Sequence, residues 1–131
     1  ALFSACAPQG KTPAEPAAVE DLGSVGQALR DSGATVEGGD SVGQAFFSVT
    51  GQILKVNGAD VQAFEYKSLE AMEAEAALVA PDGGSVGKSM AMWVATPHFF
   101  KAGRVLVLYV GDDAAILDLL KSVLGEQFAG R

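Results

Sequence analysis

The residues that most often carry chemistry are scarce in this chain. Among 131 residues there is one cysteine, Cys6, and one histidine, His98. A single cysteine excludes a disulfide bond within the chain. A single histidine, with no cysteine near it in the sequence, does not match the ligand spacings of common zinc sites. We therefore expect neither a metal centre nor a bound cofactor.

Clustered positive charge and long apolar runs are also lacking. Lys and Arg total 9 against 16 Asp and Glu, the net charge is −7, and the basic residues form no cluster. Binding to nucleic acid or to anionic lipid through charge requires such a cluster, so we expect neither. No apolar run approaches the roughly 18 residues that a membrane-spanning helix needs.

What is present divides the chain into two parts. Residues 7–20 are rich in alanine and in proline, which disfavours a regular helix and favours extended backbone. The rest is apolar enough to form a core, since 49% of the whole chain is apolar and 19% is charged. We predict a signal-like start and extended tether over residues 1–20, and a single domain over residues 21–131.

The first six residues place apolar and then small side chains ahead of the single cysteine. The segment Phe3-Ser4-Ala5-Cys6 resembles the lipobox of bacterial lipoproteins, with Leu2 one position further out than the usual leucine. Such a start is also typical of the end of a signal peptide. The resemblance implies a diacylglyceryl group on Cys6, which supplies the more than one acyl chain that stable anchoring needs. It implies an exported protein, anchored on the outer side of the cell membrane or extracellular.

The clearest local pattern is the dipeptide Asn57-Gly58, which is typical of a type I′ turn because both positions need positive φ. This turn sets a register in which Lys55 lies opposite Asp60 on one face. The other face is apolar and comprises Leu54, Val56, Ala59, Val61 and Ala63. The alternation predicts a half-buried antiparallel hairpin.

Apolar stripes at helical spacing predict three helices. They cover residues 22–32, 69–80 and 114–124. Asp21 is placed to cap the first helix and Gly33 to end it. One residue of Asp112-Asp113 is placed to cap the third.

Three further strands are predicted, at residues 34–37, 89–95 and 104–110. The first ends at Gly38-Gly39-Asp40, and residues 96–101 form a connection before a turn at Ala102-Gly103. The two later strands are apolar at nearly every position, which predicts burial on both faces.

An internal repeat joins these elements. Ser-Val-Gly occurs at residues 41–43 and again at 85–87, and residues 61–64 match residues 106–109 at nearly the same offset. Each copy, 39–80 and 83–125, contains a hairpin followed by a helix. We predict an α+β fold: an antiparallel sheet with helices packed on it, built from two pseudo-repeated β-hairpin-helix units, related by a pseudo-twofold, plus an N-terminal helix.

Few residues stand out as a functional site. Gly83 to Ser89 resembles a phosphate-binding loop, but Asp82 occupies the first glycine position, so we interpret it as a turn. His98 could act as a general base or a metal ligand, yet no partner residue is evident. Four residues are candidates for an interface or a pocket: Trp93, His98, Phe99 and Phe100. We assign no catalytic residue.

These observations favour a non-enzymatic envelope or extracellular protein that acts through contacts with a protein partner or with copies of itself. Self-assembly would use the extended N-terminal segment. Two alternatives stay open. One is a small-molecule-binding or sensor domain, with the aromatic residues in a cleft between the two units. The other is an enzyme with a polar cluster around His98.

Overall fold

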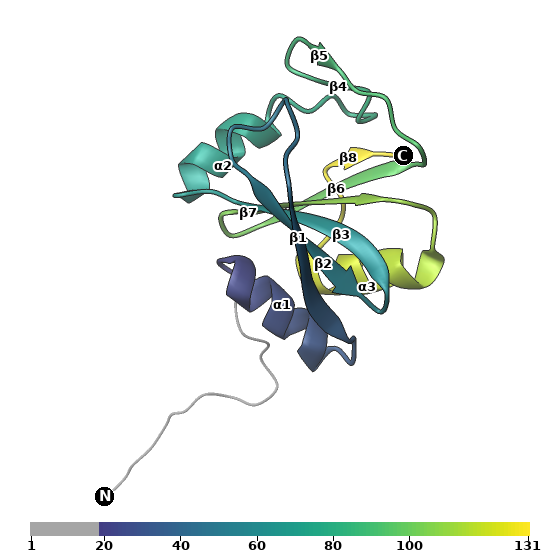
Figure 1. Ribbon diagram of the computed structural model, residues 1–131. Helices are drawn as coiled ribbons and strands as arrows, with labels where there is room; N and C mark the ends of the chain where they lie inside the picture. Colours follow the sequence, from purple (N-terminus) through teal and green to yellow (C-terminus); the bar gives the residue numbers. More distant parts are fainter. Residues whose placement is uncertain (1–18) are drawn as a thin grey trace, which may run out of the picture.

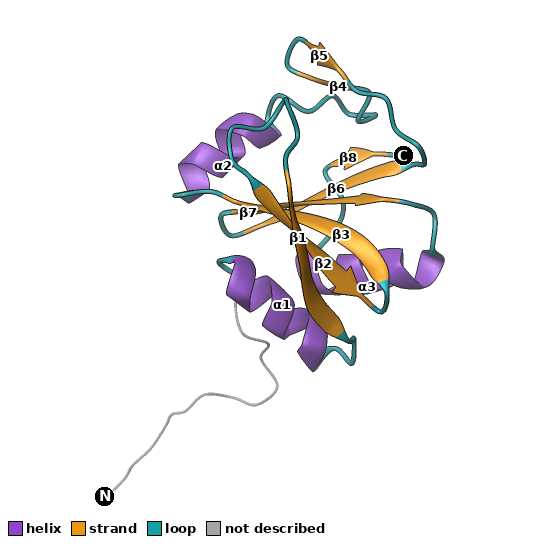
Figure 2. Ribbon diagram, in the orientation of Figure 1, coloured by secondary structure: helices purple, strands orange, loops and turns teal. Residues whose placement is uncertain are grey.

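A computed structural model describes residues 19–131, and every statement of structure below concerns that part of the chain. Its centre is a six-stranded antiparallel sheet in the order β1-β2-β3-β7-β6-β8 (Figures 1 and 2). The strands of this sheet are β1 (Val36–Val42), β2 (Gly51–Val56), β3 (Ala59–Glu65), β6 (Pro97–Ala102), β7 (Val105–Val110) and β8 (Ala129–Gly130). The helices are α1 (Leu22–Asp31), α2 (Leu69–Ala76) and α3 (Ala114–Leu124). A separate two-stranded sheet comprises β4 (Ser85–Val86) and β5 (Ser89–Met90). The predicted α+β class is confirmed.

The two faces of the large sheet are covered by different kinds of structure. On one face, which we call the helical face, α1 and α3 pack on the inward residues of β2, β3, β6 and β7. On the other, the loop face, α2 is joined by residues 43–50 and 77–96. Strand β7 lies between both layers, so Val105 to Tyr109 are all buried. The prediction that this strand is buried on both sides is confirmed, and the chain itself supplies the cover.

The elements with the strongest local patterns form as predicted. Asn57 has φ 51° and Gly58 φ 85°, as a type I′ turn requires, and Lys55 pairs with Asp60 in the expected register. Asp21 accepts from the backbone N–H of Ser24 in a capping box at the start of α1. Asp113 caps α3 in the same way, accepting from the N–H groups that follow it.

Two predicted boundaries are wrong. Strand β1 does not end at Gly38 but continues to Val42, with an irregularity in its pairing between Gly38 and Ser41. A side chain at Gly39 would lie only 3.1 Å from the Ile53 carbonyl oxygen, so this glycine permits close approach and does not mark a turn. Helix α2 ends at Ala76, four residues early, because Val79 leaves the helix and pairs with Val86.

The largest correction concerns residues 89–102. The predicted strand at 89–95 is paired only at Ser89 and Met90, whereas residues 97–101 of the predicted connection at 96–101 lie within β6. The reason is the turn at Gly103, which has φ 57° and pairs Ala102 with Val105. A two-residue hairpin beginning with glycine places the strand directly before it.

The hairpin-helix order recurs, as β2-β3-α2 and β6-β7-α3. The two helices, however, lie on opposite faces of the sheet. A twofold axis between the adjacent strands β3 and β7 would put both helices on one face, so the expected pseudo-twofold does not relate these units. The matching Ser-Val dipeptides also differ in setting, since one ends β1 and the other forms β4.

The lipobox-like start, Cys6 and nearly all of the predicted tether lie outside the described residues. Within residues 19–131, no helix has the length and apolar character needed to cross a membrane. The body begins where the Glu20 carbonyl accepts from the N–H of Arg104, beside the turn between β6 and β7.

Candidate functional site

The four candidate residues are distributed over both faces of β6 and the segment before it. Phe99 is fully buried on the loop face, and Phe100, 2% exposed, is buried on the helical face. Trp93 packs with Phe99, whereas His98 shares a shallow hollow with Phe100. The four residues therefore do not line a common cleft between the two hairpin-helix units.

Trp93 anchors the segment that precedes β6. Its indole N–H donates to the carbonyl of Gly83 at 2.7 Å. Its ring makes edge contacts with Phe46 and Phe99, each with ring centroids 5.9 Å apart. Such contacts stabilise aromatic pairs beyond the burial of their area. The segment is thereby held against the loop face by one side chain, which leaves its other side free.

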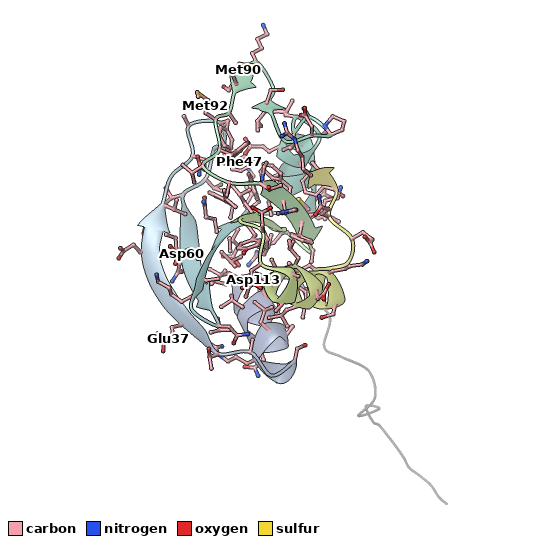
Figure 3. All side chains as sticks on the ribbon, turned by 90° about the vertical axis from the view of Figure 1, so that its right-hand side faces the viewer. Glu37, Phe47, Asp60, Met90, Met92 and Asp113 are labelled. Atoms are coloured by element: carbon pink, nitrogen blue, oxygen red, sulfur yellow. The ribbon has the colours of Figure 1, made fainter. Side chains whose placement is uncertain are left out.

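That other side carries an exposed apolar row. Met90, Met92 and Val94 are 83%, 97% and 101% exposed, while the residues between them are partly buried. Met90 and Met92 lie at the end of the molecule formed by β4 and β5 (Figures 1 and 3). Large apolar side chains grouped on a surface mark contact sites more often than isolated ones do. We call these three residues the apolar row.

His98 is the one buried polar side chain of the described chain, at 4% exposure. Its Nδ1 lies 2.8 Å from Gln127 Oε1 and its Nε2 lies 3.1 Å from the carbonyl oxygen of Gly111. Tyr109 stacks alongside at 6.1 Å between centroids. Both ring nitrogens therefore lie within hydrogen-bond distance of a polar group, and the tautomer of the ring decides which nitrogen donates.

The Gln127 amide also bonds to the C-terminal segment. Its Nε2 lies 3.3 Å from the carbonyl oxygens of both Ala129 and Arg131 and donates to them. Turning the amide over would place its oxygen against those two oxygens. His98 thus ties the C-terminal segment to the connection between β7 and α3. Both ring nitrogens are engaged, so neither is free to act as a base on a substrate.

Two shallow hollows flank this part of the molecule. One, of about 250 Å³, lies between α3 and β6 and is lined in part by His98, Asp118, Lys121 and Glu126. The Lys121 and Glu126 side chains form an ion pair at 3.0 Å. The ion pair raises the pKa of Lys121, because Glu126 accepts a hydrogen bond from the ammonium group and attracts its charge. The charges here pair with each other and lie at the surface.

The second hollow, of about 370 Å³, lies under the segment of Trp93. Its lining includes Trp93, Thr96, Asp112 and Arg131. It therefore combines an aromatic wall with one acid and one base. No group of three or more potential metal ligands occurs among residues 19–131. The glycine-rich stretch at 83–89 forms the β4–β5 hairpin, in which Gly87 has φ 60°. A phosphate-binding loop would instead lead into a helix.

A polar cluster at the edge of the loop face has a structural explanation. Glu75 Oε1 accepts from the Tyr66 hydroxyl at 2.7 Å and from the backbone N–H of Ser48 at 3.0 Å. Burial of the Tyr66 ring, and then its bond to Glu75, raises the pKa of the tyrosine far above its usual value. The cluster fixes residues 43–50 to α2, and the neutral tyrosine acts as a donor.

The predicted environment of the apolar row is wrong. The sequence predicts a strand buried on both sides at residues 89–95, whereas one side of this segment faces solvent. A useful pattern was nevertheless present, since apolar side chains without any charge run from Met90 to Ala95, directly before a second apolar stretch. Only one of the two stretches can pair with β7, and the other is left at the surface.

Comparison of the chain with protein-family models, with curated proteins and with solved structures found no match.

Proposed function

We propose that this chain is a non-enzymatic protein-binding domain of the bacterial cell envelope or its exterior, anchored through a lipid on Cys6. The observation that carries the binding role is the apolar row. Met90, Met92 and Val94 stand almost wholly in solvent, although the same segment is pinned to the body by Trp93. A contact that buried these side chains would gain about 1.5–3 kcal/mol for each one fully covered.

The residue types in the apolar row favour a protein as the binding partner. Methionine is flexible and polarizable, and it adapts to irregular apolar partners. Several ionisable side chains elsewhere serve as caps or in ion pairs, as with Asp21, Asp113 and Lys55–Asp60. The export and the anchor are supported by the resemblance of residues 3–6 to a lipobox and by the proline-rich stretch that follows.

Site-specific photo-crosslinking in cells that make the protein tests the binding role. A photoreactive amino acid replaces Met92 in one variant and Leu69 in the control. Leu69 is an exposed apolar residue of α2, at 52% exposure, away from the row. We expect a covalent protein adduct from position 92 and none from position 69. Equal labelling at both positions, or none at either, would contradict the proposal.

The anchor is tested separately by metabolic labelling with a fatty-acid analogue. We expect label on the wild-type chain and loss of label in Cys6→Ser, with the variant released from the membrane fraction. Label that persists in Cys6→Ser would exclude this anchor.

A second candidate function has its own observation. The hollow of about 370 Å³ sets Trp93 beside Asp112 and Arg131, which suits a small ligand with both charges and an apolar part. Free amino acids of different side chains are suitable probes. We expect a saturable rise in Tm with aromatic amino acids if this function holds, and its loss in Asp112→Asn.

A further inference from the structure

We propose that residues 89–95 pair with the same segment of a second copy of this chain, antiparallel about a twofold axis at Met92. This inference rests on the proposed function, because it names the partner of the apolar row. Three features of the segment carry it: its unpaired backbone, the alternation of its side chains and its lack of charge.

The backbone of this segment stops pairing where β5 ends. The N–H of Ala91 donates to the carbonyl of Gly84 at 3.0 Å. Among the described residues, the backbone groups of residues 92–95 make no hydrogen bond, and pairing resumes where the Thr96 carbonyl accepts from Gly111. Unpaired backbone next to a strand is a template for strand addition.

The side chains alternate as a strand requires. Met90, Met92 and Val94 face outward, and the residues between them face the body. With a twofold axis at Met92, Met90 of one copy lies opposite Val94 of the other. Met92 then lies opposite its own counterpart. The rows of the two copies form one continuous apolar surface, which neither copy has alone.

The distribution of charge favours contact between two copies at this segment over contact elsewhere on the surface. The chain carries a net charge of −7, so two copies repel each other over most of their surfaces. Residues 89–97 contain no acidic or basic side chain. A twofold contact brings a segment against itself, and this neutral segment can do so without opposing like charges.

The outer strands of the large sheet are poorer places for such pairing. Strand β1 has irregular pairing and includes the exposed acids Glu37 and Asp40. Strand β8 has only two residues. Bulges, edge charges and very short strands are the usual obstacles to edge pairing. The segment at 89–95 carries no charge, and although β5 itself has only two residues, residues 92–95 continue it with unpaired backbone.

The first experiment measures mass in solution by sedimentation equilibrium, with full-length chain carrying Cys6→Ser so that no lipid or thiol contributes. We expect a concentration-dependent dimer. Met92→Lys places two like charges at the axis and should raise the dissociation constant at least about tenfold. Leu69→Lys, the matched control, should leave it unchanged.

A charge-swap mixture tests the register. Met92→Lys and Met92→Glu should each be monomeric, and an equimolar mixture should recover the dimer because the opposite charges meet at the axis. Disulfide trapping gives an independent readout. In the Cys6→Ser background, Met92→Cys should form a crosslinked dimer under mild oxidation, since directly opposite residues in an antiparallel pair lie within disulfide reach. Leu69→Cys should stay monomeric.

A wild-type chain that stays monomeric at high concentration, without trapping at position 92, would overturn self-pairing. So would a dimer that Met92→Lys leaves intact. If photo-crosslinking at position 92 then yields an adduct with a different protein, self-pairing fails while the protein-binding role stands. If position 92 yields no adduct at all, both fail.

Discussion

The helical face and the loop face cover the same sheet by different means. On the helical face, α1 and α3 bury regular apolar stripes and begin at aspartate caps, Asp21 and Asp113. On the loop face, α2 has only eight residues, and irregular segments complete the cover (Figure 1). Those segments are fixed by scattered contacts, which include the Trp93–Gly83 bond, the Glu75 cluster and the buried side chains of Phe47 and Val86.

This difference bears on which segments can open locally while the rest of the molecule stays folded. A helix with an apolar stripe detaches only when many contacts are lost together. An irregular segment held by scattered side-chain contacts and hydrogen bonds can open locally at a smaller cost in free energy. The apolar row is attached to the second kind of structure, so the surface that we propose for binding lies on the more readily released face.

Substitution of the two adjacent phenylalanines of β6 is expected to have the largest effect on stability, and it tests the difference between the two faces. Phe99 and Phe100 are equally buried but point to the loop face and the helical face. Replacing either with alanine should lower the free energy of unfolding by about 3–5 kcal/mol. We expect Phe99→Ala, in addition, to speed native-state hydrogen exchange in residues 77–96, whereas Phe100→Ala should spare that segment. Equal exchange patterns in the two variants would remove the distinction.

Which parts of the fold were predictable follows the same division. The dipeptide Asn57-Gly58 specifies the turn and register of its hairpin. An apolar stripe and an aspartate cap indicate α3, so both elements can be predicted from the sequence. The strand at β6 cannot, because residues 90–95 and 97–100 are both largely apolar and only one of the two stretches can pair with β7. Gly103 decides which stretch pairs, because it is the first residue of a two-residue turn that places the strand directly before it.

The candidate site was harder to predict than the fold. Burial of His98 depends on Gln127 and Gly111, which are 29 and 13 residues away in sequence. No local pattern relates residues at such separations. The sequence does pick out Trp93 as the sole tryptophan in an uncharged segment. It does not show which side of that segment faces solvent, because every position is apolar.

A smaller effect is expected from Trp93→Phe, which keeps an aromatic ring but loses the donor to Gly83. Loss of this hydrogen bond should cost about 0.5–1.5 kcal/mol. The change should appear mainly as faster hydrogen exchange in residues 83–95, with α1 and α3 unaffected. A uniform rise in exchange across both faces would show that the anchor is part of the global core.

The smallest expected effect concerns Glu75 and depends on pH. Burial opposes its charge, but donation from Ser48 N–H and the Tyr66 hydroxyl outweighs burial and lowers the pKa of this carboxyl below 4.5. Because the folded pKa is the lower one, the carboxylate stabilises the fold above about pH 4.5. That contribution is lost as the pH falls through the folded value.

Chemical unfolding of wild type and Glu75→Gln between pH 3 and 7 measures this contribution. We expect the variant to be less stable by up to about 1 kcal/mol at pH 7 and the difference to shrink on acidification. Glu70→Gln, an exposed change on the same helix, is the control and should show no such trend. A difference that stays constant with pH would exclude the proposed role of the charge.

The contacts of His98 also limit which residues can replace it in a folded protein. Two hydrogen-bonding nitrogens stand on different sides of a flat ring, and they face Gln127 and Gly111 in two separate stretches of the chain. Asparagine and glutamine lack the ring, and the other aromatic side chains offer at most one hydrogen-bonding group. In a saturation library selected for foldedness, codon 98 should therefore tolerate fewer replacements than its equally buried apolar neighbours.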